Sequence, residues 1–192
     1  RNIDDSSSQT KQFYLPRVME LTAWLKDTFQ LPVVLGGCGF SIMPREVLEF
    51  CGADYRIWGD GEEALPELAL KLASRKDISP IPGLLVNRSG KTRGKDPVVF
   101  YPPRYVPLAE KEWLSRRSHV DNHRYFVQGG QGNVETKRGC DRPCIYCADP
   151  QGRGKTQRHR PAQHVVQEMR NLLAQGVNCF HLCDAEFNIP LE

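Results

Sequence analysis

The sequence predicts an α/β protein that contains part of one domain, a linker and the first elements of a second domain. Two stretches, 1–76 and 133–192, alternate helix-like and short strand-like segments, which is the pattern of sheets covered by helices. Between them, 77–132 is rich in proline, glycine and charge, with two short apolar pieces, 83–86 and 98–101, that would pair as one hairpin. With 192 residues, 40% of them hydrophobic, the chain is long enough to bury an apolar core.

The first stretch is predicted to open with a helix followed by a buried strand. Apolar residues recur at helical spacing over 15–29. The next run, 31–35, is short, apolar and partly β-branched, and it stops at Gly36 and Gly37, as expected of a buried strand. A proline at the start of 44–51 is suited to the first turn of a second helix over that range.

A second strand and a third helix complete this alternation. Residues 55–58 end at a glycine-rich turn, 59–61, and a helix is expected over 62–74. Elements in this order are typical of a doubly wound parallel sheet, and both glycine turns fall just past strand ends, where such a sheet opens its ligand crevice. Residues 1–76 are therefore interpreted as the later half of a Rossmann-like domain.

The second stretch is predicted to place a strand on each side of a cysteine-rich loop and a helix. The strands are expected over 133–138 and 177–183. Between them, Pro161 is placed to open the helix and Gly176 to end it. This stretch is therefore a strand, loop, helix and strand unit.

The composition argues against several classes of protein. The net charge of +3 is too small to indicate nucleic acid as a partner, and the basic residues gathered over 138–160 are interpreted as a solvated loop. No apolar run approaches the roughly 18 to 20 residues of a membrane span. Seven cysteines without a secretion signal indicate a reducing, cytoplasmic setting. Because the sequence starts at Arg1 and stops directly after a predicted strand, we expect it to be a fragment of a longer protein.

Three cysteines occupy one short loop after the strand predicted over 133–138. Cys140, Cys144 and Cys147 have the spacing C-x3-C-x2-C. Three thiolates on a four-iron cluster would leave one iron with an open coordination site, which indicates catalysis rather than structural support. A zinc ion bound by these cysteines and His159 is the alternative.

This cysteine spacing, with Tyr146 directly before the last cysteine, resembles that of the radical S-adenosylmethionine enzymes. The resemblance implies a partial TIM-type (β/α) barrel, truncated after its first β/α units, and a 4Fe–4S cluster that splits S-adenosylmethionine reductively into methionine and a 5′-deoxyadenosyl radical. It also implies that Tyr146 lies against the adenine. Where the family has a Gly-Gly-Glu-like motif, this chain has Asp184-Ala185-Glu186. Glu186 is therefore expected to bind the methionine ammonium, and Asp184 is the competing candidate.

The first stretch resembles the cobalamin-binding domain of the B12-dependent class of these enzymes. The resemblance rests on 33–37, on Ser41 and Pro44, and on 57–62. It implies that Gly36 and Gly37 let the backbone approach the nucleotide tail of cobalamin, because glycine has no Cβ to obstruct the approach. A tight turn is the alternative explanation for the same two glycines.

Together, these resemblances imply an enzyme that binds a 4Fe–4S cluster, S-adenosylmethionine and cobalamin and methylates an unreactive carbon of a small molecule. An external electron donor such as flavodoxin or ferredoxin would reduce the cluster. One alternative is a tRNA methylthiotransferase-like radical enzyme, for which further cluster cysteines would be expected in the first domain. The other is a zinc-stabilised nucleic-acid-binding module that uses the three loop cysteines and His159. No catalytic side chain and no particular substrate are assigned.

Overall fold

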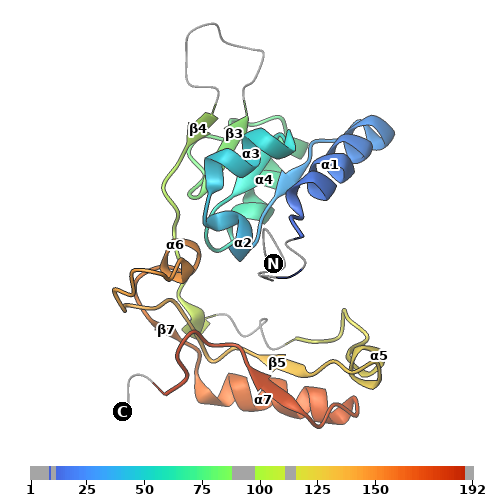
Figure 1. Cartoon of the computed structure of the whole chain (residues 1–192), viewed down its shortest axis with the longest axis vertical. Coiled ribbons are helices and arrows are strands. Elements are labelled where there is room, and N and C mark those ends of the chain that lie inside the picture. Colours follow the sequence, from blue (N-terminus) through green and yellow to red (C-terminus); the bar gives the residue numbers. More distant parts are fainter. Residues whose placement is uncertain (1–8, 10–11, 88–97, 111–115, 189–192) are drawn as a thin grey trace, which may run out of the picture. The chain divides into compact units, whose positions relative to one another are not determined.

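The computed structural model describes four parts of the 192-residue chain, namely 9, 12–87, 98–110 and 116–188 (Figure 1). The chain divides into two compact units, of which the first comprises 1–106 with 146–153 and the second comprises 107–145 with 154–192. A short segment that follows the cysteine loop therefore belongs to the first unit, although it lies far from that unit in the sequence.

The first unit is a four-stranded sheet with helices on both faces. Its elements, in chain order, are α1 (Leu15–Phe29), β1 (Val34–Leu35), α2 (Cys38–Ser41), α3 (Pro44–Cys51), β2 (Tyr55–Ile57), α4 (Ala64–Ala73), β3 (Leu84–Asn87), β4 (Val98–Phe100) and α6 (Asp149–Arg153). Proline occupies the first turn of both α1 and α3, where its missing N–H costs no helical hydrogen bond. The sequence predicts α1, α3 and α4 nearly at these bounds, but not α2 or α6.

The sheet has the strand order β1-β2-β3-β4, and only its first pair is parallel. β3 and β4 are antiparallel to their neighbours, and they are the two apolar pieces that the sequence predicts as a hairpin within a linker. The two pieces pair with each other as predicted, but they also extend the first sheet, so that the sheet is mixed rather than all parallel. Leu84 and Leu85 point to opposite faces of β3 and both are buried, so this strand needs a cover on each side.

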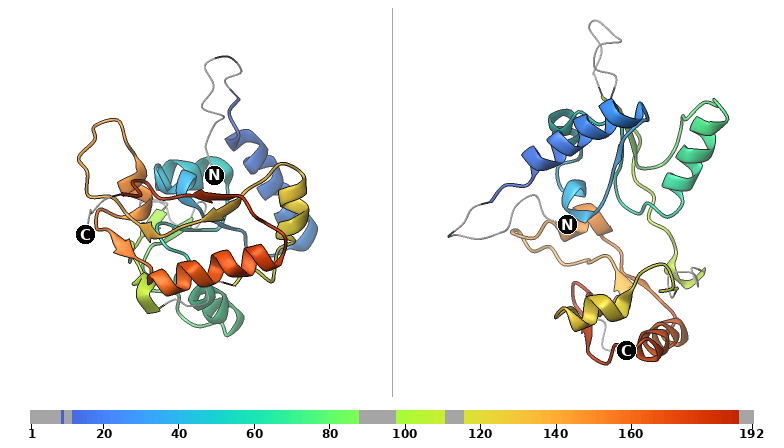
Figure 2. Two further views of the ribbon diagram at one scale, coloured as in Figure 1. Left: turned by 90° about the horizontal axis from the view of Figure 1, so that it is seen from below. Right: turned by 90° about the vertical axis from the view of Figure 1, so that its right-hand side faces the viewer.

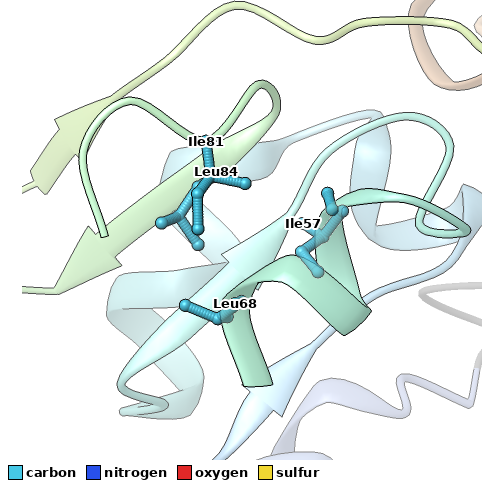
Figure 3. Packing of buried hydrophobic residues seen from close by; sticks show 5 residues of the cluster. Ile57, Leu68, Ile81 and Leu84 are labelled. Atoms are coloured by element: carbon cyan, nitrogen blue, oxygen red, sulfur yellow. The ribbon is translucent and has the colours of Figure 1, made fainter. Parts of the chain in front are cut away.

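Helices supply that cover on the two faces. Leu84 packs with Ile57 of β2 and Leu68 of α4 (Figure 3). Leu85 points to the opposite face and packs with Leu48 of α3. Figure 2 shows α1 and α4 on opposite sides of the sheet. Full burial of such a side chain contributes about 1.5 to 3 kcal/mol, so these clusters fix the sheet that carries the glycine turns.

The second unit contains two two-stranded sheets and one long helix. Its elements, in chain order, are η1 (Leu108–Glu110), α5 (Asn122–Val127), β5 (Gly132–Val134), β6 (Lys137–Arg138), β7 (Arg158–His159), α7 (Ala162–Ala174) and β8 (Phe180–Leu182). β5 pairs with β8 in parallel, and β6 pairs with β7 antiparallel. α7 lies along the first of these sheets (Figure 1) and packs on it through Val134, Leu172 and Val177. Pro161 precedes α7 and Gly176 follows it, as the sequence predicts.

The strand predicted over 133–138 is divided into β5 and β6 by a side chain. Asp184 Oδ1 accepts hydrogen bonds from the backbone N–H groups of Thr136, at 2.7 Å, and of Lys137, at 3.1 Å. Its Oδ2 accepts from the Thr136 hydroxyl at 2.5 Å. Because these two amides bond to a carboxylate rather than to a neighbouring strand, the ladder is interrupted where the chain turns toward the cysteine loop.

A buried carboxylate ties α7 to the end of β5. Glu168 is 2% exposed and accepts hydrogen bonds from Arg117 Nε at 2.7 Å and from Arg160 Nη1 at 2.6 Å. Arg160 Nη1 also donates to the Glu135 carbonyl at 2.6 Å, and Arg117 Nη2 donates to the Asn133 carbonyl. Bonds of this kind, with a charged donor or acceptor, are stronger than neutral ones. The network therefore holds the strand from which the cysteine loop departs.

The helices of both units are short. α1 has 15 residues and α7 has 13. Among the helices of the four described ranges, none combines the length and the hydropathy needed to cross a membrane.

Candidate functional site

The residue before the first cysteine fixes where the cysteine loop begins. Gly139 has a φ of +86°, and a Cβ there would lie 2.2 Å from the carbonyl oxygen of Thr156 and 3.1 Å from that of Gly154. The N–H of Cys140 donates to the Gly154 carbonyl at 3.1 Å. Cys140 is therefore held against the segment that returns from the loop, and only glycine fits at the position before it.

The rest of the loop is open to solvent. Cys140 is buried, Cys144 and Cys147 are exposed, and none of the three is in a disulfide. All of 141–147 is exposed, and the side chain of Tyr146 is 88% exposed. Three free thiols within eight residues, two of them accessible, form a donor set that suits an iron–sulfur cluster assembled on the loop.

The three loop cysteines are divided between the two units. Cys140 and Cys144 are part of the second unit, whereas Cys147 lies in the segment that belongs to the first. Within the described part of the chain, no three His, Cys, Asp or Glu side chains are arranged to hold a metal ion. His159, the fourth ligand of the zinc alternative, is exposed on β7. The ligand assignment therefore remains a prediction from the cysteine spacing.

The two acids that follow β8 have different surroundings. The carboxylate of Asp184 is occupied by Thr136 and Lys137, as described above. Glu186 is exposed and has no hydrogen-bond or ion-pair partner among the residues that the structure describes. The hydrogen bonds therefore distinguish the two candidates for binding an ammonium group. The Asp184 carboxylate holds the backbone, whereas the Glu186 carboxylate is available to a ligand.

The two glycines after β1 face open space. Both are exposed, and a Cβ added at either would meet no atom within 4 Å. Gly37, which precedes α2, has a φ of +102°, whereas Gly36 lies outside this left-handed region. An accessible backbone at the carboxyl end of a strand suits the close approach of a ligand such as the nucleotide tail of cobalamin.

Sequence reasoning missed the residues that connect the first unit to the end of the cysteine loop. α6 follows that loop and packs against α2. The indole N–H of Trp58 donates to the carbonyl of Gln151 at 2.6 Å across 93 positions of sequence. Trp58 is visible in the sequence as the end of a predicted strand, but no local pattern indicates a contact so far along the chain.

The fold and the candidate site define a class of protein. An α/β unit with an open glycine turn after its first strand precedes a strand, loop, helix and strand unit whose loop carries C-x3-C-x2-C. This combination is that of the radical S-adenosylmethionine enzymes in which a cobalamin-binding domain precedes the barrel.

Comparison with known proteins gives the particular family. No protein-family model matches the chain. The tryptophan 2-C-methyltransferase of Streptomyces laurentii is 34% identical to it, in an alignment that covers 83% of this chain and 34% of the relative. The structure of the radical S-adenosylmethionine methyltransferase TsrM from Kitasatospora setae, with tryptophan and an S-adenosylmethionine analogue bound, is 33% identical with a TM-score of 0.84, covering 98% of this chain and 36% of that one. The cobalamin-dependent S-adenosylmethionine radical enzyme OxsB shares the fold, with a TM-score of 0.64 at 17% identity over 91% of this chain and 24% of that one.

The chain belongs to the cobalamin-dependent radical S-adenosylmethionine enzymes. The family and the α/β fold class predicted from the cysteine spacing and the glycine turns are confirmed, including the first β/α elements of a radical barrel. The chain spans about a third of the length of the methyltransferases it matches, 34% of one and 36% of the other.

Proposed function

We propose that this chain supplies the cluster loop and part of the cobalamin site of an enzyme that methylates an unreactive carbon of a small molecule. The observation that carries the proposal is the loop 140–147, with three free thiols, in a chain of this family. The relative from Streptomyces laurentii is named for methylation of carbon 2 of tryptophan, which supports a carbon acceptor in a small molecule. An external electron donor such as flavodoxin or ferredoxin and a cytoplasmic location are parts of the same proposal.

In this proposal, Cys140, Cys144 and Cys147 ligate three irons of a 4Fe–4S cluster. When bound, the cluster supplies the electron that splits the sulfonium of S-adenosylmethionine, and cobalamin carries the methyl group. Cys140 is the fixed ligand, because its N–H is bonded to the Gly154 carbonyl and its side chain is buried. Cys144 and Cys147 are exposed, so both thiols are accessible to the metal as it is incorporated.

Two exposed side chains bind S-adenosylmethionine in this proposal. The carboxylate of Glu186 binds the methionine ammonium, as an acceptor that no described residue occupies. Tyr146, next to the third cysteine and 88% exposed, covers the adenine, which removes its ring from water. Asp184 acts on the fold instead, by holding the backbone between β5 and β6.

The cluster assignment is tested by replacing each loop cysteine singly with Ala in the anaerobically purified full-length protein. Iron and sulfide analysis should show loss of the cluster in all three variants. Cys179→Ala, which removes an exposed thiol outside the loop, and Cys51→Ala, which removes a buried one, should retain it. Full cluster occupancy in Cys144→Ala would overturn the assignment.

The cobalamin site is tested most sharply at Gly36. A side chain there strains neither the backbone nor its neighbours, so Gly36→Val should keep a normal melting temperature without cobalamin and lose cobalamin binding. Gly37→Val is the less specific variant, because a φ of +102° strains any L side chain and lowers stability as well. Unchanged cobalamin affinity in folded Gly36→Val would remove these glycines from the site.

A further inference from the structure

The segment after the third cysteine is part of the first unit, and α6 packs directly on α2. Gly152 of α6 is buried, and a Cβ there would lie 3.4 Å from the carbonyl oxygen of Cys38 and from the Cβ of Ser41. The two short helices are thus in contact through their backbones. Cys147 stands only two positions before the start of α6, so its place depends on this contact.

The side chain that directly follows β2 binds the middle of α6. The Trp58 indole N–H donates to the Gln151 carbonyl at 2.6 Å, and the Tyr105 hydroxyl donates to the same oxygen at 3.4 Å. The carbonyls of the last helical turn have no partner within their own helix, so they need such donors. Trp58 is itself held, since its backbone N–H donates to the Gly83 carbonyl at 2.8 Å and its ring lies 5.3 Å from that of Phe100.

The same helix α2 also holds the glycine turn. The Ser41 hydroxyl donates to the Gly37 carbonyl at 3.1 Å and accepts from the N–H of Gly59 at 3.4 Å. A continuous set of hydrogen bonds and backbone contacts therefore runs from the glycine turn, through α2, to α6 and Trp58. One end of this set is the proposed cobalamin site, and the other end carries a proposed cluster ligand.

We propose that Trp58 is a positioning residue that couples cobalamin binding to the cluster, by fixing the Cys147 segment on the helix that forms the glycine turn. The inference rests on the proposed function. Cobalamin at the glycine turn orders α2, and a cluster bound through Cys147 orders α6, so each ligand stabilises the contact that the other needs. Such coupling is reciprocal, and its usual size is about 5-fold to 150-fold in affinity.

The test compares cobalamin affinity of the full-length protein with and without its cluster. Wild type should bind cobalamin at least about fivefold more tightly when the cluster is present. Trp58→Phe keeps an aromatic ring and loses the N–H, so the ratio of the two affinities should fall to about one, while affinity in the cluster-free protein stays within about twofold. Tyr105→Phe, which removes the longer hydrogen bond, is the matched control and should keep most of the ratio.

A second variant acts on the same contact from the other side. An added Cβ at Gly152 would already be in van der Waals contact with α2, so the further methyl groups of Gly152→Val should push the two helices apart and also reduce the ratio, without changing Trp58. A wild-type ratio near one, or a wild-type ratio retained in both Trp58→Phe and Gly152→Val, would overturn the coupling while leaving the cofactor assignment intact. Absence of cobalamin binding in cluster-loaded wild type would overturn the proposed function, and the coupling with it.

Discussion

The two units bury arginine in opposite ways. In the first, Arg56 on β2 is 0% exposed. Its Nη1 donates to the Met43 carbonyl at 3.2 Å. Its Nε and Nη2 have no hydrogen-bond partner in the described part of the chain. In the second, Arg117 and Arg160 share the buried carboxylate of Glu168. The first unit thus contains a buried charge without a paired carboxylate, and the second is built around a compensated one.

Burying the Arg56 charge without an ion-pair partner costs free energy at neutral pH. Burial lowers the pKa of Arg56 from 12.5 to about 10, because desolvation disfavours the charged form. Between these values the unfolded chain binds more protons than the folded one, so the free energy of unfolding rises with pH only in that window. The apolar clusters around β3 offset the cost. The comparison teaches that the first unit depends on packing and the second on polar connections.

The largest expected effect comes from Glu168→Gln, which removes the charge shared by two arginines. It should lower the free energy of unfolding by about 3 to 5 kcal/mol, because the buried guanidinium of Arg160 and the half-buried one of Arg117 lose their counter-charge. Denaturant unfolding and hydrogen exchange of the α7 amides measure it. Glu67→Gln breaks a partly exposed pair with Lys71 on α4 and is the matched control, with an expected change below about 0.5 kcal/mol. Similar losses in the two variants would contradict the proposed dependence of the second unit on buried charge.

The apolar counterpart in the first unit is Leu68→Ala. Removing this fully buried side chain should cost about 2 to 5 kcal/mol, because the cavity beside β3 cannot close completely. Leu70→Ala on the exposed side of the same helix should change stability by less than about 0.5 kcal/mol. Hydrogen exchange should increase in α4 and β3 and stay unchanged in α7. Equal loosening of α7 would show that the two units do not have separate cores.

A smaller effect should separate the two acids after β8. Asp184→Asn should lower the free energy of unfolding by about 1.5 to 3 kcal/mol, because a charged acceptor of two backbone N–H groups is lost. Glu186→Gln should leave stability unchanged and weaken S-adenosylmethionine binding by about tenfold to a hundredfold, the value of a charge-assisted contact. Thermal unfolding and equilibrium binding to the cluster-loaded full-length protein measure the two properties. The reverse pattern would exchange the two assignments.

The smallest effect is expected at Arg56. Arg56→Met should leave the free energy of unfolding unchanged or raise it by about 1 to 2 kcal/mol, since a poorly satisfied buried cation is replaced by an apolar side chain of similar length. Arg160→Met should instead lower it by about 3 to 5 kcal/mol, because Glu168 would be left with one partner fewer. A clear loss in Arg56→Met would mean that its bond to the Met43 carbonyl stabilises the fold.

Elements with local signals could be predicted from the sequence. The helices that begin at Pro44 and after Pro161 are found where proline and apolar periodicity place them, and Gly176 follows α7 as expected. The pairing of β3 and β4 with the first sheet could not be predicted, because a short apolar run does not indicate which strand it will pair with. Sheet membership depends here on burial of both faces of β3, which is a property of the tertiary structure.

The candidate site divides in the same way. Spacing indicated the three loop cysteines, and the resemblance to a cobalamin-binding domain implied a role for the two glycines after β1; each motif is complete within a few residues. The role of Asp184 as a backbone acceptor and the contact of Trp58 with Gln151 join residues 48 and 93 positions apart. Contacts at such separations leave no periodic or local trace in a single sequence.

In a mutational scan of this loop, Gly139 should be as intolerant of substitution as a metal ligand. Its left-handed backbone and the nearby Thr156 carbonyl exclude every other side chain, so substitutions there should score as badly as loss of the adjacent Cys140. Such a profile would place Gly139 among the functional positions, although a glycine has no atom that could bind iron. Soluble yield, measured without any cofactor, would separate Gly139 from the cysteines. The glycine variants should fail to fold, whereas the cysteine variants should fold and lose only the metal.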